Sequence, residues 1–157
     1  MPDVNYFRRE LGRLVISTDP HCLDSNAVFA FLEQAQWWTG LTHESLDRAI
    51  RNSLCFSLIE DGRQIGLARV ITDYATYAYL CDVYIMEQRR RQGLGSWLIR
   101  SVLEHPDLKH LKRVALITHD AQTFYLGLDF RFTSESNSYM ERLQEAQTAA
   151  TRNVDAE

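Results

Sequence analysis

The sequence predicts an α/β fold in which helices flank a mixed sheet. Strand-like runs of β-branched and aromatic residues alternate with stretches of helical periodicity, and an Asp-Gly step joins two of these runs. A glycine pair stands between the longest strand-like run and a helix. The chain has 157 residues, which is enough for one domain. We expect this domain to span residues 1–140, followed by a C-terminal tail over residues 141–157.

The first part of the chain predicts a strand and two helices. The apolar run from Leu14 to Ser17 ends at an Asp-Pro step, which suits a strand followed by a turn. From Asp24 to Ala35 apolar residues fall at helical spacing, and either Asp24 or Ser25 is placed to cap the first turn. A second helix is expected from about Glu44 to Asn52, with Thr42 as its cap.

Three strands are expected next. Leu54 to Ile59 and Gln64 to Thr72 are strand-like runs, and the loop between them contains Asp61-Gly62, a strong hairpin signal. The run from Ala75 to Met86 is rich in aromatic and β-branched residues, so it predicts a long central strand.

The last part of the chain predicts two helices and two strands. Ser96 to Leu103 suits a helix that a His-Pro step ends. Val114 to Thr118 is a continuous apolar run, typical of a strand covered on both faces. Ala121 to Leu126 is long enough for one or two helical turns, and Phe130 to Phe132 is expected to begin a final strand.

Composition argues against several classes of protein. The net charge of -4 disfavours a general nucleic-acid binder, because such binding depends on neutralising phosphates. No apolar run reaches the roughly 20 residues of a membrane helix, and the N-terminus lacks the apolar stretch of a signal peptide. The three cysteines are widely spaced and form no zinc-ligand pattern. We expect a cytoplasmic protein with no nucleic-acid partner, no membrane partner and no metal.

The most informative motif is R-x-x-G-x-G, in which Arg90 precedes Gly93 and Gly95 between a strand and a helix. Glycines let the backbone turn tightly and approach a ligand, and the first N–H groups of a helix are unpaired. Such a helix start binds anions, especially phosphates. The arginine run from Arg89 to Arg91 adds positive charge and directional donors.

The two glycines of this motif do not by themselves establish a phosphate site, because they also suit an ordinary turn beside solvated arginines. A nucleoside-triphosphate loop would need a Gly-Lys-Ser/Thr step, which the sequence lacks. A dinucleotide-binding fingerprint would need a third glycine at position 98, where Leu98 stands. The neighbouring segments therefore decide between a solvated turn and a phosphate site of a different kind.

Those segments resemble the GNAT superfamily of acetyltransferases. LCDVYIMEQRRRQGLGSWLI is similar to the family's central strand, pyrophosphate loop and helix, and LITHDAQTFYLGLDF is similar to its next strand and tyrosine segment. Phe56 to Thr76 resembles bacterial single-domain members in particular. The resemblance covers roughly Cys55 to Phe132 and implies the GNAT acyl-CoA N-acyltransferase fold, a central, mostly antiparallel sheet with a splayed strand pair and flanking helices.

The resemblance implies acetyl-CoA as co-substrate and a primary amine of a small molecule or peptide as acceptor. It implies that the strand backbone pairs with the pantetheine arm at Val83, Tyr84 and Ile85. The residues that it implies around the pyrophosphate are Arg90, Arg91, Gln92, Gly93, Leu94, Gly95 and Ser96.

Two side chains are candidates for proton transfer. Tyr125 matches the family tyrosine that protonates the departing thiolate, and the alternative is a tyrosine that only packs. A lysine-like ammonium is mostly protonated at neutral pH, so a base or a water chain has to remove a proton. We favour Asp82 as this base, with Asp73 and His119 as alternatives, although each also suits a surface or turn position.

The acceptor site is less defined. Aromatic residues that suit either an acceptor pocket or the core are Trp37, Trp38, Tyr74, Tyr77 and Tyr79. The identity of the amine and the choice between a monomer and a homodimer stay open.

One departure from the family pattern supports a second hypothesis. The family usually has Gly-Phe where this chain has Asp129-Phe130, although Asp tolerates left-handed backbone conformations better than most residues. The alternative function is a non-catalytic acyl-CoA-binding module for sensing or regulation. A weaker third hypothesis is a nucleic-acid or partner-binding domain that uses the arginine run.

Overall fold

The computed structural model describes residues 5–35, 38–134 and 138–144. The chain divides into two compact units, Met1–Gln122 and Thr123–Glu157. The first unit contains the sheet and three of the four α-helices described below, and the second contains most of the short helix α4 (Gln122–Leu126).

The first unit is built on a six-stranded sheet with strand order β1-β2-β3-β4-β5-β6. The strands are β1 (Arg8–Leu11), β2 (Leu14–Ser17), β3 (Leu54–Glu60), β4 (Arg63–Thr72), β5 (Ala78–Ile85) and β6 (Val114–Ala115). All neighbouring pairs are antiparallel except β5 and β6, which are parallel. The prediction of a mixed, mostly antiparallel sheet is confirmed.

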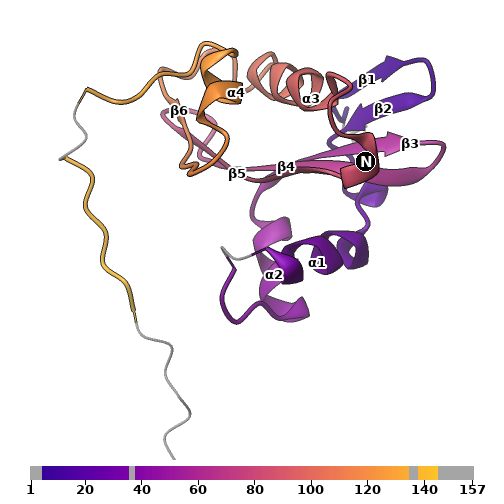
Figure 1. The fold of residues 1–157 in the computed structure, drawn as a ribbon, viewed down its shortest axis with the longest axis horizontal. Helices are drawn as coiled ribbons and strands as arrows, with labels where there is room; N and C mark the ends of the chain where they lie inside the picture. Colours follow the sequence, from indigo (N-terminus) through magenta and orange to yellow (C-terminus); the bar gives the residue numbers. More distant parts are fainter. Residues whose placement is uncertain (1–4, 36–37, 135–137, 145–157) are drawn as a thin grey trace, which may run out of the picture. The chain divides into compact units, whose positions relative to one another are not determined.

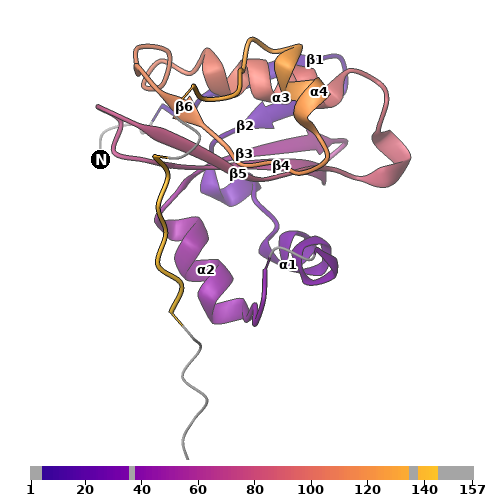
Figure 2. The same cartoon turned by 60° about the vertical axis from the view of Figure 1, so that its left-hand side comes forward.

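Helices cover both faces of this sheet. α1 (Ser25–Gln34) and α2 (His43–Arg51) lie on one face, and α3 (Leu94–Leu103) lies on the other (Figures 1 and 2). The expected caps are present, because Asp24 accepts a hydrogen bond from the N–H of Ala27 and Thr42 accepts one from the N–H of Ser45. Two short 3-10 turns, Pro20–Cys22 and Glu87–Arg89, complete the unit.

Apolar side chains fill the space between the sheet and each helical layer. Toward α1 and α2, a buried cluster contains Val28, Leu32, Leu46, Leu67 and Tyr84. The fully buried α3 residues are Leu98, Ile99, Ser101 and Val102, and α3 contacts β3, β4 and β5. The central strands are therefore covered on both faces, which explains the continuously apolar segments of β4.

The last two strands separate soon after they meet. β6 pairs with β5 at two positions only, Ala78 with Val114 and Tyr79 with Ala115. From Leu80 to Ile85, β5 therefore has no strand partner among the described residues on the edge that faces β6. The expected splayed strand pair is confirmed. The strand predicted from Val114 to Thr118 is only two residues long, Val114–Ala115, because its hydrogen-bonded pairing with β5 ends at Ala115.

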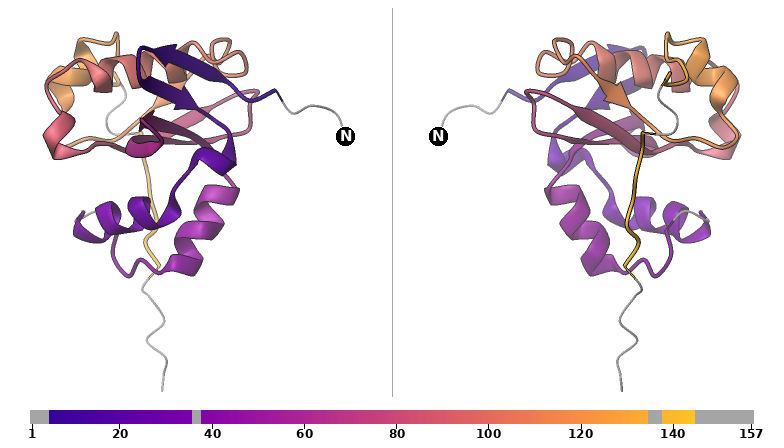
Figure 3. Two further views of the ribbon diagram at one scale, coloured as in Figure 1. Left: turned by 90° about the vertical axis from the view of Figure 1, so that its right-hand side faces the viewer. Right: turned by 90° about the vertical axis from the view of Figure 1, so that its left-hand side faces the viewer.

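Other differences from the predicted elements have local causes. β1 was not predicted because its RREL sequence is polar, and it forms as an edge strand through backbone pairing with β2 (Figure 3). The helix predicted from Ser96 begins two residues earlier, at Leu94. The predicted strand from Phe130 to Phe132 does not form, and the N–H of Phe130 donates instead to the carbonyl of Tyr125 at 3.1 Å. Within the described ranges, no helix has the length and apolar character needed to cross a bilayer.

Candidate active site

The start of α3 leaves an unpaired row of backbone donors. Gly93 is the N-cap in the left-handed conformation, with φ 76°, and no side chain caps the helix. The first helical hydrogen bond joins the N–H of Trp97 to the carbonyl of Gly93 at 3.0 Å. The N–H groups of Leu94, Gly95 and Ser96 have no partner among the described residues, as expected at a helix start. This end of α3 therefore suits an anion.

The three arginines before this helix differ in what they contact. Arg89 is tied to Glu60 of β3 at 2.7 Å, and the Nε of Arg90 donates to the carbonyl of Ile85 at 3.0 Å. Arg91 has a positive φ of 61°, is exposed, and forms no hydrogen bond or ion pair with another described residue. Arg91 is thus the arginine most available to an external anion, while Arg89 anchors the turn that leads into the loop.

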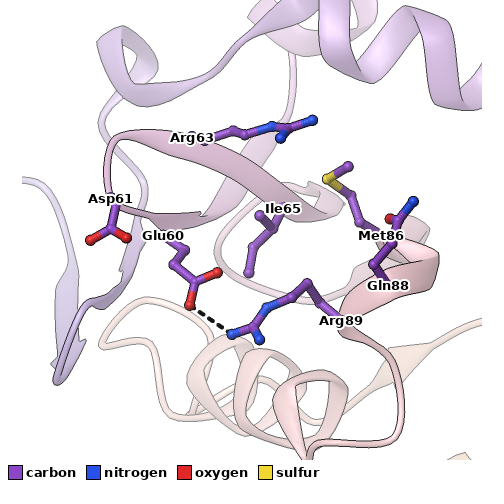
Figure 4. A pocket seen from close by; sticks show the side chains of 7 residues that line it. All are labelled: Glu60, Asp61, Arg63, Ile65, Met86, Gln88 and Arg89. Carbon is purple, nitrogen blue, oxygen red and sulfur yellow. Dashed lines mark hydrogen bonds and ion pairs between the residues drawn. The ribbon is translucent and has the colours of Figure 1, made fainter.

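A cavity of about 530 Å³ lies beside this loop, between the β3–β4 hairpin and the turn after β5 (Figure 4). Its lining residues are Glu60, Asp61, Arg63, Ile65, Met86, Gln88 and Arg89. The ion pair between Glu60 and Arg89 forms part of its wall. None of the residues predicted to bind the co-substrate lines this cavity, so we do not place the reaction there.

The predicted pantetheine strand offers its backbone rather than its side chains. Tyr84 is 6% exposed, stacks on Phe31 with ring centroids 3.9 Å apart, and its hydroxyl accepts a hydrogen bond from Gln64. Burial raises the pKa of Tyr84 to about 12. Val83 and Ile85 are partly buried. The tyrosine side chain therefore belongs to the core and is not available to a ligand.

A β-bulge interrupts the same strand. Leu67 pairs with Tyr84 and Arg69 pairs with Cys81, so two residues of β5, Asp82 and Val83, face a single residue of β4. Asp82 adopts a positive φ of 48°. A bulge twists the strand locally and leaves backbone groups unpaired, and such bulges are frequent next to active sites.

The side chain of Asp82, our candidate base, is buried and accepts hydrogen bonds from two other side chains. One carboxylate oxygen, Oδ2, accepts from the Nε of Arg69 at 2.6 Å, and the other, Oδ1, accepts from the Nε1 of Trp38 at 2.9 Å. Burial is the largest single influence on the pKa of the Arg69 guanidinium and lowers it. The charge of Asp82, the nearby Cys81 and Cys55 and the hydrogen bond to Asp82 together outweigh burial and raise this pKa above its usual value. Both carboxylate oxygens of Asp82 therefore already accept a hydrogen bond from a side chain that shares its buried surroundings.

The two alternative bases differ in their surroundings. Asp73 accepts hydrogen bonds from the hydroxyl of Thr76 and from three backbone N–H groups of the β4–β5 turn. The side-chain hydrogen bond from Thr76, followed by those from the backbone, holds the pKa of Asp73 well below its usual range. Asp73 therefore acts as a turn residue. His119 is exposed after β6 and forms no hydrogen bond or ion pair with another described side chain.

Tyr125, the candidate acid, lies in the second unit just before a regular helix end. The N–H of Phe130 donates to the carbonyl of Tyr125 at 3.1 Å, and the N–H of Asp129 donates to the carbonyl of Leu126 at 3.3 Å. Asp129 has φ 64°. Together these features form a Schellman motif in which Asp129 takes the left-handed position that glycine usually occupies. The departure from the family pattern at Asp129 leaves this turn intact.

The Tyr125 ring is buried and packs edge-on against Phe130, with centroids 5.5 Å apart. Burial raises the pKa of Tyr125 to about 12. The phenol is therefore protonated at neutral pH, as a proton donor requires. The packing of the ring gives a structural reason for an aromatic residue at position 125. The role of Tyr125 as an acid stays a prediction.

The aromatic residues proposed for an acceptor pocket are dispersed. Trp37 lies outside the described residues, and Trp38 contacts Asp82. Tyr77 is exposed near the start of β5, and Tyr74 lines a different cavity, of about 420 Å³, together with residues of the N-terminal segment. Tyr79 is partly buried in β5. No cluster of three or more potential metal ligands occurs in the described part of the chain.

Two residues in this region were missed by sequence reasoning. Arg69 is 7% exposed in a central strand, and Glu60 holds Arg89. A charged residue between apolar neighbours in the middle of a predicted strand, as Arg69 is, was an available signal of a buried ion pair. The sequence carries no comparable signal for Glu60, because a glutamate at a hairpin end is ordinary.

In the first unit, the strands separate beside a bulge in β5, and a helix that begins behind Gly93 follows the bulged strand. The family model described as "Acetyltransferase (GNAT) family" matches residues 24–130. The chain belongs to the GNAT acetyltransferase family.

Similar proteins agree with this assignment. A Gibberella zeae protein whose name places it among the acetyltransferases is 36% identical over 145 residues, which covers 76% of this chain and 82% of the relative. A crystal structure from Xanthomonas campestris pv. campestris, assigned to the same family, has 38% identity and a TM-score of 0.80 over 86% of this chain and 96% of its own. A Clostridium acetobutylicum structure with acetyl-CoA has 13% identity and a TM-score of 0.61, covering 88% and 95%, and shows likeness of fold alone.

Proposed function

We propose that this protein moves the acetyl group of acetyl-CoA to a primary amine of a small molecule or peptide. The observation that supports this most strongly is the start of α3 behind Gly93, whose first N–H groups are unpaired, after a strand that pairs with β6 only as far as Tyr79. The first feature suits the charges of a pyrophosphate, and the second suits an arm that carries amide groups. Coenzyme A contains both.

The proposed chemistry is direct attack of the amine on the thioester. The nitrogen has to be neutral, the oxyanion needs donors, and the departing thiolate needs a proton. We assign the oxyanion to backbone N–H groups beside the bulge at Asp82, and the proton to Tyr125. A phenol of ordinary pKa, about 10, already carries its proton at neutral pH, and burial raises the pKa of Tyr125 to about 12.

We further propose that the two units form one GNAT domain. The family match runs from residue 24 to residue 130 and therefore crosses the boundary between Gln122 and Thr123.

The direct test is release of free thiol from acetyl-CoA in the presence of amines. A panel of polyamines, amino sugars, amino acids and peptide N-termini should contain at least one compound that raises thiol release well above hydrolysis. Mass spectrometry of the product should show one added acetyl group. If coenzyme A binds but no amine accelerates release, the non-catalytic sensing module becomes the better hypothesis.

Binding of coenzyme A should stabilise the fold. A ligand that binds only the folded state adds about 2.7 kcal/mol at a concentration 100 times its Kd. For a chain of this size we expect the melting temperature to rise by roughly 5–10 °C, measured by scanning calorimetry at increasing ligand concentration. An unchanged melting temperature at millimolar coenzyme A would count against both the enzyme and the sensing module.

Gly93→Ala should weaken coenzyme A binding roughly tenfold. The left-handed backbone at Gly93 costs a residue with a Cβ about 1–2 kcal/mol, and the helix start would shift away from its donor geometry. Open space surrounds the position, so the protein itself creates no clash. Calorimetric titration gives the Kd.

The matched control is Gly12→Ala in the turn between β1 and β2. Gly12 has φ 58° and also has open space around its Cβ position. This variant should lose similar stability and keep the affinity for coenzyme A. Equal losses of affinity in both variants would mean that Gly93 acts only through overall stability.

A further inference from the structure

The buried ion pair between Arg69 and Asp82 has no assigned role in the proposed reaction. Both side chains are almost fully buried, with 9% and 2% of their side-chain surfaces exposed, and the Nε to Oδ2 distance is 2.6 Å. Cys55 and Cys81 flank Arg69 on the neighbouring strands. Burial raises the pKa of Cys55 to about 12 and that of Cys81 to about 11, so both thiols are neutral beside the charged pair.

This pair sits at the one irregular point of the strand proposed to bind the co-substrate. Asp82 is the bulged residue of β5, and its φ of 48° lies in a region that most side chains avoid. Such a conformation persists only when surrounding contacts hold it. The two hydrogen bonds to its carboxylate, from Arg69 and Trp38, are contacts of this kind.

The same contacts reach the helical layer that covers this face of the sheet. Trp38 follows α1 in the chain, and its ring lies 5.8 Å from the guanidinium of Arg69. The Nη1 of Arg69 donates to the hydroxyl of Ser53 at 3.0 Å, and that hydroxyl donates to the carbonyl of Ala49 in α2 at 2.7 Å. One polar network therefore connects the bulge of β5 with the segment after α1 and with the end of α2.

We propose that Arg69, Asp82 and Trp38 are positioning residues that hold the β5 bulge in the shape the acetyl transfer needs. In this arrangement Asp82 sets the direction of the neighbouring backbone N–H groups and does not remove a proton. Trp38 contributes through its hydrogen bond to Asp82 and its ring contact with Arg69. This inference rests on the proposed function, because it names residues that support its oxyanion donors.

Asp82→Asn separates positioning from base catalysis. Asn tolerates the left-handed backbone and can still accept from Trp38, but it removes the charge that faces Arg69. If Asp82 positions the bulge, kcat should fall about 10- to 100-fold at every pH, since a displacement near 1 Å can cost about 10² in rate. The midpoint of the rise in rate with pH should not move, and the Kd of acetyl-CoA should change less than about threefold.

The matched control is Asp61→Asn. Asp61 also has a positive φ, 49°, and also pairs with an arginine, Arg13, but at an exposed hairpin. This variant should keep wild-type kcat. Trp38→Phe keeps a ring over Arg69 and removes the Nε1–H donor, so it should lower kcat in the same direction as Asp82→Asn and by less.

Amide hydrogen exchange gives a readout that does not depend on turnover. Asp82→Asn also leaves the buried Arg69 charge without its partner, so exchange at Phe56 and Leu58 in β3 reports the general loss of stability. The amides of Val83 and Tyr84 should gain at least tenfold more in exchange rate than those two amides. Unchanged exchange at the bulge, or a rate that recovers to wild type at high pH, would overturn the positioning role. If no amine is acetylated by the wild type, the exchange result still decides this inference separately from the proposed function.

Discussion

Arg69→Met is expected to lower the free energy of unfolding by about 3–5 kcal/mol, the cost of leaving a buried charge without its partner. Methionine preserves much of the volume and length of the arginine side chain, so the loss reports the stranded carboxylate of Asp82 rather than a cavity. Asp82 keeps its hydrogen bond from Trp38, which offsets only part of the cost. Urea denaturation followed by tryptophan fluorescence measures the effect.

A double-mutant cycle isolates the charge from the packing. Adding Asp82→Asn to Arg69→Met removes the uncompensated charge, so the double variant should be more stable than Arg69→Met alone. Arg13→Met, which breaks the exposed pair with Asp61, should change stability little. If Arg13→Met lowers the free energy of unfolding as much as Arg69→Met does, burial does not explain the contribution of the Arg69–Asp82 pair to stability.

Tyr125→Phe is expected to lower turnover by roughly 10² or more while the Kd of acetyl-CoA stays near that of the wild type. The substitution keeps the ring and its edge-on contact with Phe130 and removes the only proton that the side chain can donate. Turnover is measured by thiol release with the best amine from the panel, or by acetyl-CoA hydrolysis if none is found. A full rate across the pH range would end the acid assignment.

The pH profile gives a second check on Tyr125. The rate should rise with pH as the amine loses its proton, and no fall should follow below about pH 10, because the raised pKa of about 12 keeps the phenol protonated there. Tyr139→Phe is the matched control, since Tyr139 lies in the same unit and is 66% exposed. A loss of melting temperature in Tyr125→Phe together with a normal rate per folded molecule would indicate that Tyr125 only packs.

The helices and the hairpin were predictable because their signals are local. The caps at Asp24 and Thr42 form as expected, since a side-chain oxygen placed before a helical stretch bonds the nearest free N–H groups. The Asp61-Gly62 turn joins β3 to β4 because both residues accept a positive φ. The helix start at Gly93 was also predictable from a local signal, the two glycines between a strand and a helix.

Pairing between distant strands was harder to predict. β1 has a polar sequence and is stabilised by its backbone hydrogen bonds to β2. The pattern of its side chains does not predict this pairing. The strand expected at Phe130 does not form because its N–H group serves the helix end at Tyr125. In both cases the hydrogen-bond partner of the backbone decides the structure, and the residue types decide little.

For the candidate site, the sequence by itself determined the family, the glycine-led helix start and the strand assigned to the co-substrate. Only the tertiary structure decided the state of Asp82, because Arg69 and Trp38 come from a neighbouring strand and a distant segment. It also showed that Arg89 is held by Glu60, and that Arg91 is available to an external anion. The physical reason is that whether a charged group is free or paired depends on which groups the fold brings within hydrogen-bonding distance, and spacing along the chain does not encode this.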